Sequence, residues 1–306
     1  MTNRSILAIV VTLHDDPRAV TAIGALRAQV GAFCRLLVID NEAGPNPVDL
    51  GQAGGAVLTI ERQRHLENVG LSGALESAIR VSGADFLLNI NPDCILDPWA
   101  LASAVEVLES SPAVGAVAFH LRRPDGTLDS AGISLSRWTL RAFDRGAGRS
   151  ETEFQADDDV DAPCLAASLL RISAVRAAAD GAYEVFDTRF MAYQEDVDLG
   201  WRLRRAGFRV RHVVKASGIH ERGFRPGDRT AIPAHIRRWS LRNRWWTLIK
   251  NASWWGLLLR SPMIILQEGA IVGYLLVKEP GTLAAYADIF RGLSSTLRRR
   301  RIHRAP

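Results

Sequence analysis

Short apolar runs alternate with helically spaced segments along the first 119 residues of the chain. The apolar runs are rich in β-branched side chains and occupy residues 6–13, 36–39, 57–60, 86–90 and 114–119. Between them, residues 19–29, 68–80 and 98–110 repeat apolar side chains at the spacing of helices. Strands that are apolar throughout are typical of a parallel sheet covered on both faces. The pattern therefore predicts an α/β nucleotide-binding half over residues 1–119.

The pattern changes after residue 119. Residues 120–161 are more polar and predict hairpins and loops, whereas residues 162–175 are apolar again. Residues 195–205 have helical spacing, and residues 210–214 predict one more strand. We therefore expect a catalytic domain over residues 1–230. Its second half, residues 120–230, is expected to bind the acceptor substrate and to carry catalytic residues.

The remaining residues, 231–306, predict an amphipathic helical region that associates with a membrane. Tryptophans and basic residues precede an apolar stretch at residues 256–277, which is long enough to cross a bilayer. Arg260 and Glu268 interrupt it, and a central arginine costs about 2.5–3.5 kcal/mol in a spanning helix. This favours helices that lie in the membrane interface, with a packed cap and a true span as alternatives. The basic tail, residues 297–304, suits a solvated end or anionic lipid.

Composition narrows the class and compartment of the protein. With 47% hydrophobic and 23% charged residues, the chain of 306 residues suits one or two globular domains. The net charge of +5 is modest, and we expect no nucleic-acid partner. Cys34, Cys94 and Cys164 match no zinc spacing, which fits a reducing compartment. The apolar segment at residues 6–13 is too short for a signal peptide, so a cytoplasmic location is expected.

Polar residues follow three of the predicted strands, where open parallel sheets bind ligands. They are Asp40, Asn68 and Asp93. Asp93 ends the segment Asn91-Pro92-Asp93 and is a candidate ligand for Mg2+ or Mn2+, which prefer carboxylate oxygens. A turn closed by the Asp93 side chain is the alternative. Asp40 is placed either to accept a hydrogen bond from a nucleotide base or to cap the loop that follows it.

A second acidic cluster, Glu195-Asp196-Val197-Asp198, begins the predicted helix at residues 195–205. Neighbouring carboxylates raise one another's pKa or recruit a cation, although acidic residues also favour helix N-termini for ordinary dipole reasons. In a helix, Glu195 and Asp198 share a face, which leaves Asp196 free to face a cleft while another carboxylate pairs with Arg202. His220 follows the last strand and is either a ligand of metal or diphosphate, or an exposed loop residue.

Taken in order, six segments resemble the motifs of family-2 inverting glycosyltransferases, and among them the rhamnosyltransferase-like members. The segments cover residues 10–13, 37–41, 67–74, 88–93, 123–126 and 186–207, within about residues 6–225. The resemblance implies a GT-A fold, with a Rossmann-like, mostly parallel sheet flanked by helices. It also implies a divalent cation as cofactor and a nucleotide-diphosphate sugar as donor, carried on dTDP, UDP or GDP.

The same resemblance implies roles for individual residues. Asp196 becomes the general base, Glu195 beside it is the second catalytic residue, and Asp93 and His220 hold the metal ion. Asp40 contacts the base. The other predicted contacts to the nucleotide sugar lie in the matched segments and are Thr12, Asn68, Gly70, Asn91 and Asp93.

The sequence thus predicts an inverting glycosyltransferase that moves a sugar, rhamnose by subgroup likeness, to a hydroxyl of its acceptor. The expected acceptor is a polyprenyl-linked or other cell-envelope glycan, used at the inner face of the cytoplasmic membrane by a peripheral protein. Two alternatives remain. A catalytically inactive, membrane-associated scaffold is left open by Leu13-His14 and Leu165, which depart from the family pattern. A nucleotidyltransferase needs a glycine-rich triphosphate loop, and residues 14–18 contain no glycine.

Overall fold

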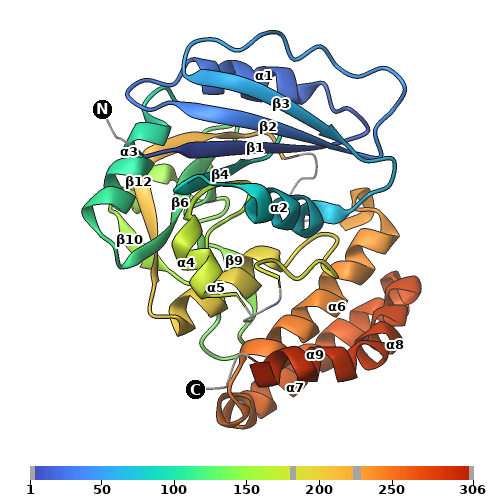
Figure 1. The fold of residues 1–306 in the computed structure, drawn as a ribbon. Helices are drawn as coiled ribbons and strands as arrows, with labels where there is room; N and C mark the ends of the chain where they lie inside the picture. Colours follow the sequence, from blue (N-terminus) through green and yellow to red (C-terminus); the bar gives the residue numbers. More distant parts are fainter. Residues whose placement is uncertain (1–3, 180–183, 223–228, 303–306) are drawn as a thin grey trace.

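The computed structural model describes residues 4–179, 184–222 and 229–302. Its centre is a ten-stranded mixed sheet whose main path is β10-β12-β6-β11-β4-β1-β2-β3 (Figure 1). Beside this path, β5 pairs with β12 and β7 pairs with β6, whereas β8 and β9 form a separate hairpin. The strands are β1 (Ile6–Leu13), β2 (Cys34–Asn41), β3 (Val57–Arg64), β4 (Phe86–Ile90), β5 (Cys94–Leu96), β6 (Val114–Arg122), β7 (Leu128–Ser130), β8 (Ile133–Leu135), β9 (Ala142–Asp144), β10 (Asp158–Val160), β11 (Ala167–Arg171) and β12 (Arg209–His220).

The first half of the sheet is parallel, as its apolar runs predict. β1 lies between β2 and β4 and runs parallel to both. Alternate side chains of β1 enter two different cores, so that Ala8 packs on one face and Ile9 on the other. Helices α1 (Arg18–Arg27) and α3 (Ala100–Ser110) cover the first face, while α2 (Gly70–Val81) and α4 (Ile172–Ala177) cover the second. α5 (Glu195–Arg205) contributes to both cores.

The second half of the sheet mixes directions. β11 is antiparallel to both β4 and β6, and β6 is parallel to β12. β12 was expected over residues 210–214, but it continues to His220 because a register shift between Val213 and Ser217 lets pairing with β6 resume. Residues 120–161 form the short strands and the 3₁₀ turn η1 (Glu151–Phe154), in keeping with the predicted hairpins and loops.

The C-terminal region is helical. Its elements are η2 (Arg229–Ala231), α6 (Ala234–Asn251), α7 (Trp254–Lys278), η3 (Pro280–Leu283), α8 (Ala284–Arg291) and α9 (Leu293–Ile302), drawn in orange and red in Figure 1. α6 is fastened to the catalytic half by buried charges, since Lys250 Nζ lies 2.8 Å from Asp198 Oδ1 and 3.1 Å from Asp187 Oδ2. α6 is therefore a packed cap on α5.

α7 differs from α6 because most of its surface is exposed. Among the described residues it is the one helix long and apolar enough to cross a membrane, with 11% of its most apolar window buried. Part of the basic tail turns inward, since Arg299 lies 3.0 Å from Glu184 and Arg300 is nearly buried over the ring of Trp254. The last two residues of that tail, His303 and Arg304, lie outside the described residues.

Candidate active site

The carboxyl ends of three neighbouring strands bring the predicted site residues to one edge of the sheet. Thr12 on β1 is in register with Asp40 on β2, and Val10 on β1 is in register with Ile90 on β4. Asp93, three residues beyond Ile90, therefore lies just past the same edge. Ligand sites in open α/β sheets form at such edges.

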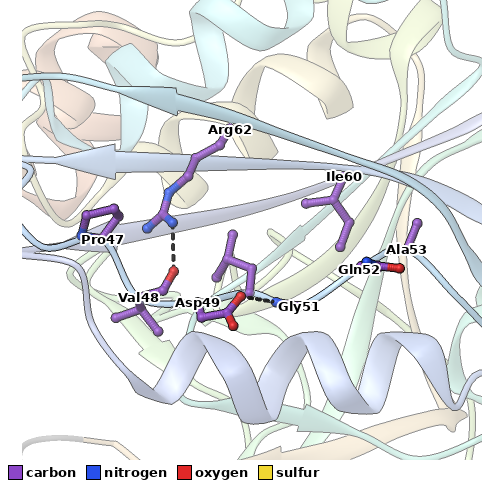
Figure 2. A pocket seen from close by; sticks show the side chains of 9 residues that line it. Pro47, Val48, Asp49, Gly51, Gln52, Ala53, Ile60 and Arg62 are labelled. Carbon is purple, nitrogen blue, oxygen red and sulfur yellow. Dashed lines mark hydrogen bonds between the residues drawn. The ribbon is translucent and has the colours of Figure 1, made fainter.

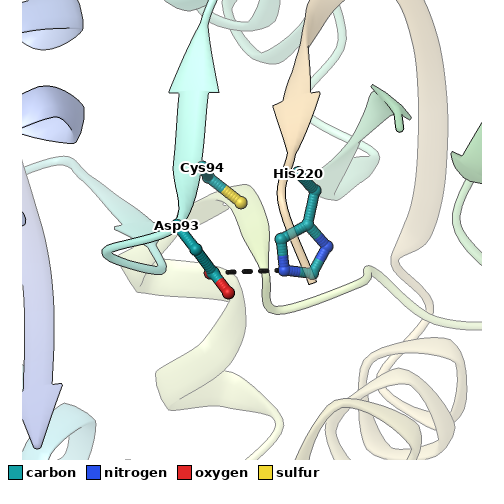
Figure 3. Close-up of side chains that lie close together, drawn as sticks. All are labelled: Asp93, Cys94 and His220. Atoms are coloured by element: carbon teal, nitrogen blue, oxygen red, sulfur yellow. Dashed lines mark ion pairs between the residues drawn. The ribbon is translucent and has the colours of Figure 1, made fainter. Parts of the chain in front are cut away.

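Asp93 and His220 come together because β5 pairs with the end of β12. Cys94, the residue after Asp93, is in register with His220 in this antiparallel pair. As a result, Asp93 Oδ1 lies 3.3 Å from His220 Nε2 (Figure 3). This separation suits two neighbouring ligands of one cation, because metal–ligand distances near 2.1 Å at right angles put such atoms about 3 Å apart.

Cys94 is the third member of this group, with ligand atoms of all three residues within 4.8 Å of one another. Burial raises the pKa of the Cys94 thiol well above its ordinary value, so the sulfur stays protonated. Hard cations such as Mg2+ and Mn2+ prefer oxygen and imidazole nitrogen to a thiol. The side chain of Cys94 is thus an uncharged neighbour of the Asp93–His220 pair.

The orientation of His220 is set by a residue that the sequence reasoning missed. Asp129, fully buried in β7, accepts a hydrogen bond from Nδ1 of His220 at 2.8 Å. Arg222 Nε and Arg123 Nε also donate to Asp129, at 2.9 and 3.2 Å. Burial would lower the pKa of His220, but its hydrogen bonds to Asp129 and Asp93 raise it above its ordinary value.

The donor set at this edge fits a divalent cation. Because Nδ1 of His220 donates to Asp129, Nε2 of His220 faces the carboxylate of Asp93. A lone pair on Nε2 and a lone pair on the Asp93 oxygen repel each other, and a proton or a cation between the two atoms removes that repulsion. A carboxylate behind a ligating imidazole is a common support in metal sites. Asp93 and His220 would hold the ion, with Asp129 as the support.

The acidic pair Glu195-Asp196 begins α5, as predicted. Burial raises the pKa of both carboxyls, that of Glu195 further because of the neighbouring charge of Asp196. The charge of Asp144 also raises the pKa of Asp196, while Arg222 opposes the shift. Since Arg222 bonds both Asp129 and Asp144, at 2.9 and 2.7 Å, a chain of charges joins the surroundings of Asp196 to the Asp93–His220 pair.

The backbone just before this pair is strained. Tyr193 and Gln194 have φ angles of 67° and 77°, a left-handed conformation that costs non-glycine residues about 1–3 kcal/mol each. Asn243, fully buried in α6, donates to the backbone oxygens of Ala192 and Tyr193 at 2.9 and 3.0 Å. Strain that is held in place by the surrounding structure is typical of functional sites.

The third carboxylate of the cluster has a structural role. Asp198 is buried and pairs with Arg202 at 2.9 Å, as expected for a carboxylate one turn before that arginine. The charges of Lys250 and Arg202 outweigh burial and lower the pKa of Asp198 to about 2. Asp198 is therefore a fixed anion inside the α5–α6 contact, while Asp196 is half-buried on a different side of the helix.

Asp40 is held in a closed network in the structure. It is fully buried, Thr12 Oγ1 donates to it at 2.5 Å and Arg62 Nε donates at 2.5 Å. β3 continues past its predicted end at residue 60, which brings Arg62 and Arg64 beside Asp40. Both carboxylate oxygens thus have partners, and binding a nucleotide base there requires Arg62 to move. The base contact of Asp40 stays a prediction.

A cavity of about 660 Å3 lies beside this network, between β3 and the loop that follows β2 (Figure 2). Arg62 lines it and donates to the backbone oxygen of Val48 at 2.7 Å. None of Asp93, Asp196 or His220 lines this cavity. Arg62 joins this cavity to Asp40, whereas the cavity shares no lining residue with the Asp93–His220 pair.

The other residues that are predicted to bind the nucleotide sugar occupy defined positions, and their role stays a prediction. Asn68 accepts a hydrogen bond from the backbone of Gly70 at 2.8 Å, which starts α2. Gly70 has a φ angle of 70°, and a Cβ there would lie 2.8 Å from the backbone of Met191. The Asn68–Gly70 turn therefore packs against the loop before Glu195. Asn91 closes the turn that carries Asp93, through its backbone oxygen and the amide of Cys94 at 3.0 Å.

Comparison with known proteins defines the class of fold. No protein-family model matches the chain. Its structure is similar to mannosyltransferase PcManGT from Pyrobaculum calidifontis in complex with GDP-Man and Mn2+, with a TM-score of 0.57, 12% identity, and coverage of 99% of this chain and 86% of that one. It is also similar to GalNAc-T7 with UDP, GalNAc and Mn2+, with a TM-score of 0.56, 10% identity, and coverage of 82% and 48%. The chain has the GT-A fold of glycosyltransferases, as expected.

In sequence, the chain is similar to the N-acetylglucosaminyl-diphospho-decaprenol L-rhamnosyltransferases of two strains of Mycobacterium tuberculosis, CDC 1551 / Oshkosh and ATCC 25618 / H37Rv. Each is 26% identical over 189 residues, covering 58% of this chain and 59% of the relative. The chain thus spans less than two thirds of the length of these relatives. The resemblance to rhamnosyltransferase-like proteins is confirmed.

Proposed function

We propose that the chain is an inverting glycosyltransferase that moves a sugar from a nucleotide-diphosphate donor to an acceptor hydroxyl. The observation that carries the proposal is the Asp93–His220 pair at the same end of the sheet as the half-buried acid Asp196, on a GT-A fold. A metal-ion ligand pair and a base with a raised pKa are the two groups that such a transfer needs.

Asp196 acts as the general base in this proposal. Its carboxylate takes the proton of the acceptor hydroxyl, whose oxygen forms a bond to the anomeric carbon as the bond to the diphosphate breaks. Because one displacement occurs, the anomeric configuration inverts. A raised pKa makes Asp196 a stronger base than an exposed carboxylate.

Asp93 and His220 would hold a divalent cation, Mg2+ or Mn2+, with Asp129 behind His220. When bound, such an ion neutralises the charge that develops on the leaving diphosphate. Arg18 supplies a second positive group at this edge, since its NH1 lies 3.3 Å from Asp93 and its side chain is 45% exposed. Thr12, Asp40, Asn68, Gly70 and Asn91 remain the proposed contacts to the nucleotide sugar.

The donor and acceptor are proposed from the sequence relatives. Similarity to rhamnosyltransferases with a diphospho-decaprenol acceptor favours a dTDP-, UDP- or GDP-linked sugar, with rhamnose first, and a polyprenyl-linked or other cell-envelope glycan as acceptor. The exposed apolar face of α7 supports a peripheral position on the cytoplasmic side of the membrane.

The test is transfer by the purified chain with Mn2+, a donor panel and a polyprenyl-diphosphate glycan, followed by mass spectrometry of the product. Asp196→Asn is expected to lower turnover by about 10²–10⁴-fold while donor binding persists. Glu109→Gln, at an exposed position of α3, is the matched control and keeps full turnover. Unchanged turnover in Asp196→Asn would exclude Asp196 as the base.

One observation favours the second candidate, a catalytically inactive scaffold. Both oxygens of Asp40 are occupied by Thr12 and Arg62, so the proposed base contact is closed. The same donor panel separates the two functions. An inactive scaffold hydrolyses and transfers no nucleotide sugar at any metal concentration, and its binding of donors does not depend on Asp93.

A further inference from the structure

A second cavity, of about 630 Å3, shares no lining residue with the Asp93 site. It lies between the second half of α5, the loop joining β8 to β9, and the junction of α6 with α7. Trp201 and Asp161 line it together with four arginines, Arg137, Arg204, Arg205 and Arg260. The cavity therefore collects an excess of positive charge on one side of the molecule.

Only part of this charge is balanced by carboxylates. Arg204 pairs with Asp161. Arg260 bonds backbone oxygens instead, those of Arg137 at 2.8 Å and Gly256 at 3.2 Å. Within the described part of the chain, no ion pair joins Arg137 or Arg260 to an acidic side chain. Guanidinium groups placed in this way match the oxygens of a phosphate.

Exposed tryptophans flank the cavity on two sides. Trp138 follows Arg137 in the β8–β9 loop and is 62% exposed, while Trp254 and Trp255 begin α7 and are 54% and 75% exposed. The guanidinium of Arg137 lies 5.6 Å from the ring centre of Trp138. Exposed indoles beside arginines are typical of a surface that meets the headgroup layer of a membrane.

α7 continues this surface with its outer face. Its polar residue Glu268 points to the protein, where Arg244 NH2 and Trp245 Nε1 contact it at 2.5 and 2.9 Å. Away from Glu268 the helix is apolar and exposed: Leu259, Met263, Leu266 and Val277 lie opposite Glu268, and Leu258, Ile265 and Leu276 lie on the flank. A surface helix of a soluble protein normally packs its apolar face on the core and exposes its polar face to solvent. Large exposed apolar patches mark contact surfaces.

We propose that the arginine-lined cavity binds the phosphate of an anionic phospholipid headgroup while the outer face of α7 lies in the adjacent membrane interface. The inference deepens the proposed membrane association and rests on it. Unbalanced arginines, exposed indoles and an apolar helix face occur together here, and an anionic lipid surface complements all three. Arg204 follows Asp196 by eight residues of α5, about 12 Å of helix, so the proposed lipid site and the proposed base lie on the same helix.

The test is sedimentation of the full chain with vesicles, without any sugar donor. Wild-type protein is expected to bind vesicles of phosphatidylcholine and phosphatidylglycerol far better than vesicles of phosphatidylcholine alone, and to dissociate as salt rises. Arg137→Gln with Arg260→Gln is expected to lose about tenfold or more of the charge-dependent partitioning. The matched control, Arg35→Gln with Lys215→Gln, removes two exposed positive charges elsewhere and keeps it.

Three results would overturn the proposal. Equal partitioning of the cavity variant and the control would show that binding follows net charge only. Binding of wild-type protein that ignores phosphatidylglycerol would exclude a phosphate site. A stable dimer that ignores vesicles would show that a second copy covers α7. Thermal unfolding checks that the cavity variant is folded, and because the assay contains no donor, failure of the proposed sugar transfer leaves its outcome unchanged.

Discussion

Asp129 accepts a hydrogen bond from His220 at 2.8 Å across 91 residues of sequence, and this contact directs the other imidazole nitrogen toward Asp93. Replacing Asp129 with Asn keeps the size of the side chain but removes its charge. We expect Asp129→Asn to weaken Mn2+ binding by about 10–100-fold, as for other carboxylates behind a ligating histidine. Electron paramagnetic resonance of free Mn2+ measures this without substrates.

Asp125→Asn is the control for the Asp129 variant. Asp125 is exposed in the same hairpin and bonds only Thr127 among the described residues, so its loss leaves Mn2+ affinity unchanged. Mn2+ affinity that is equal in the two variants would mean that Asp129 does not support the metal site.

The acid limb of the pH–rate profile should report Asp196. A general base works when deprotonated, and burial raises the pKa of Asp196, so kcat/KM is expected to fall with acid well above the pH range of ordinary carboxyl groups. Removing a negative neighbour lowers a raised carboxyl pKa, and Asp144→Asn should move this limb to lower pH. A limb near pH 4, or one that Asp144→Asn does not move, contradicts the assignment.

Lys250 is predicted to be a main anchor of α6. It is nearly fully buried and lies within 3.1 Å of both Asp187 and Asp198, so its loss leaves buried negative charge short of a partner. Lys250→Met should lower the free energy of unfolding by about 3–5 kcal/mol. Urea unfolding measures the change, with Lys215→Met, at an exposed position of β12, expected to stay within about 0.5 kcal/mol of wild type.

Two buried histidines should make the fold sensitive to acid. Nδ1 of His120 and Nε2 of His212 lie 3.1 Å apart, and burial lowers the pKa of His212 to about 4. Because the folded-state pKa is depressed, stability is full above the unfolded value of about 6.5 and falls as pH drops toward 4. The single-site loss is on the order of 3 kcal/mol.

His212→Gln should flatten this pH dependence, because the side chain no longer titrates. Urea midpoints at pH 7 and pH 5 measure the slope, and His14→Gln, at an exposed position, should leave it as in wild type. A slope that survives in His212→Gln would assign the acid sensitivity to other groups.

Most of the parallel half of the fold was predictable, because buried strands such as residues 36–39 are apolar on both faces and can be recognised in the sequence. The antiparallel direction of β11 was not, since an apolar run carries no sign of direction. The length of β12 depended on a register shift that only pairing with β6 reveals.

In the site, Asp93 and Asp196 were predicted because each lies in a motif at the end of a regular element, and His220 was predicted from its place 24 residues beyond Asp196. Asp129 and Asn243 were not, because a single Asp in a hairpin or an Asn in a helix has no local signature. The hydrogen bonds between Asp129 and His220 and between Asn243 and the loop before Glu195 span 50–91 residues of sequence. The ion pair of Asp40 with Arg62 was missed for the same reason, as it depends on how far β3 extends.

The bonds of Asn243 to the loop before Glu195 have a practical consequence for anyone who wishes to shorten the protein. A truncation near residue 231, made to obtain a more soluble fragment, would remove Asn243 and with it the hydrogen bonds that hold the left-handed backbone of Tyr193 and Gln194. Such a fragment would retain every proposed catalytic side chain and still lack the conformation that aims one of them. Solubility is better sought by polar substitutions on the outer face of α7.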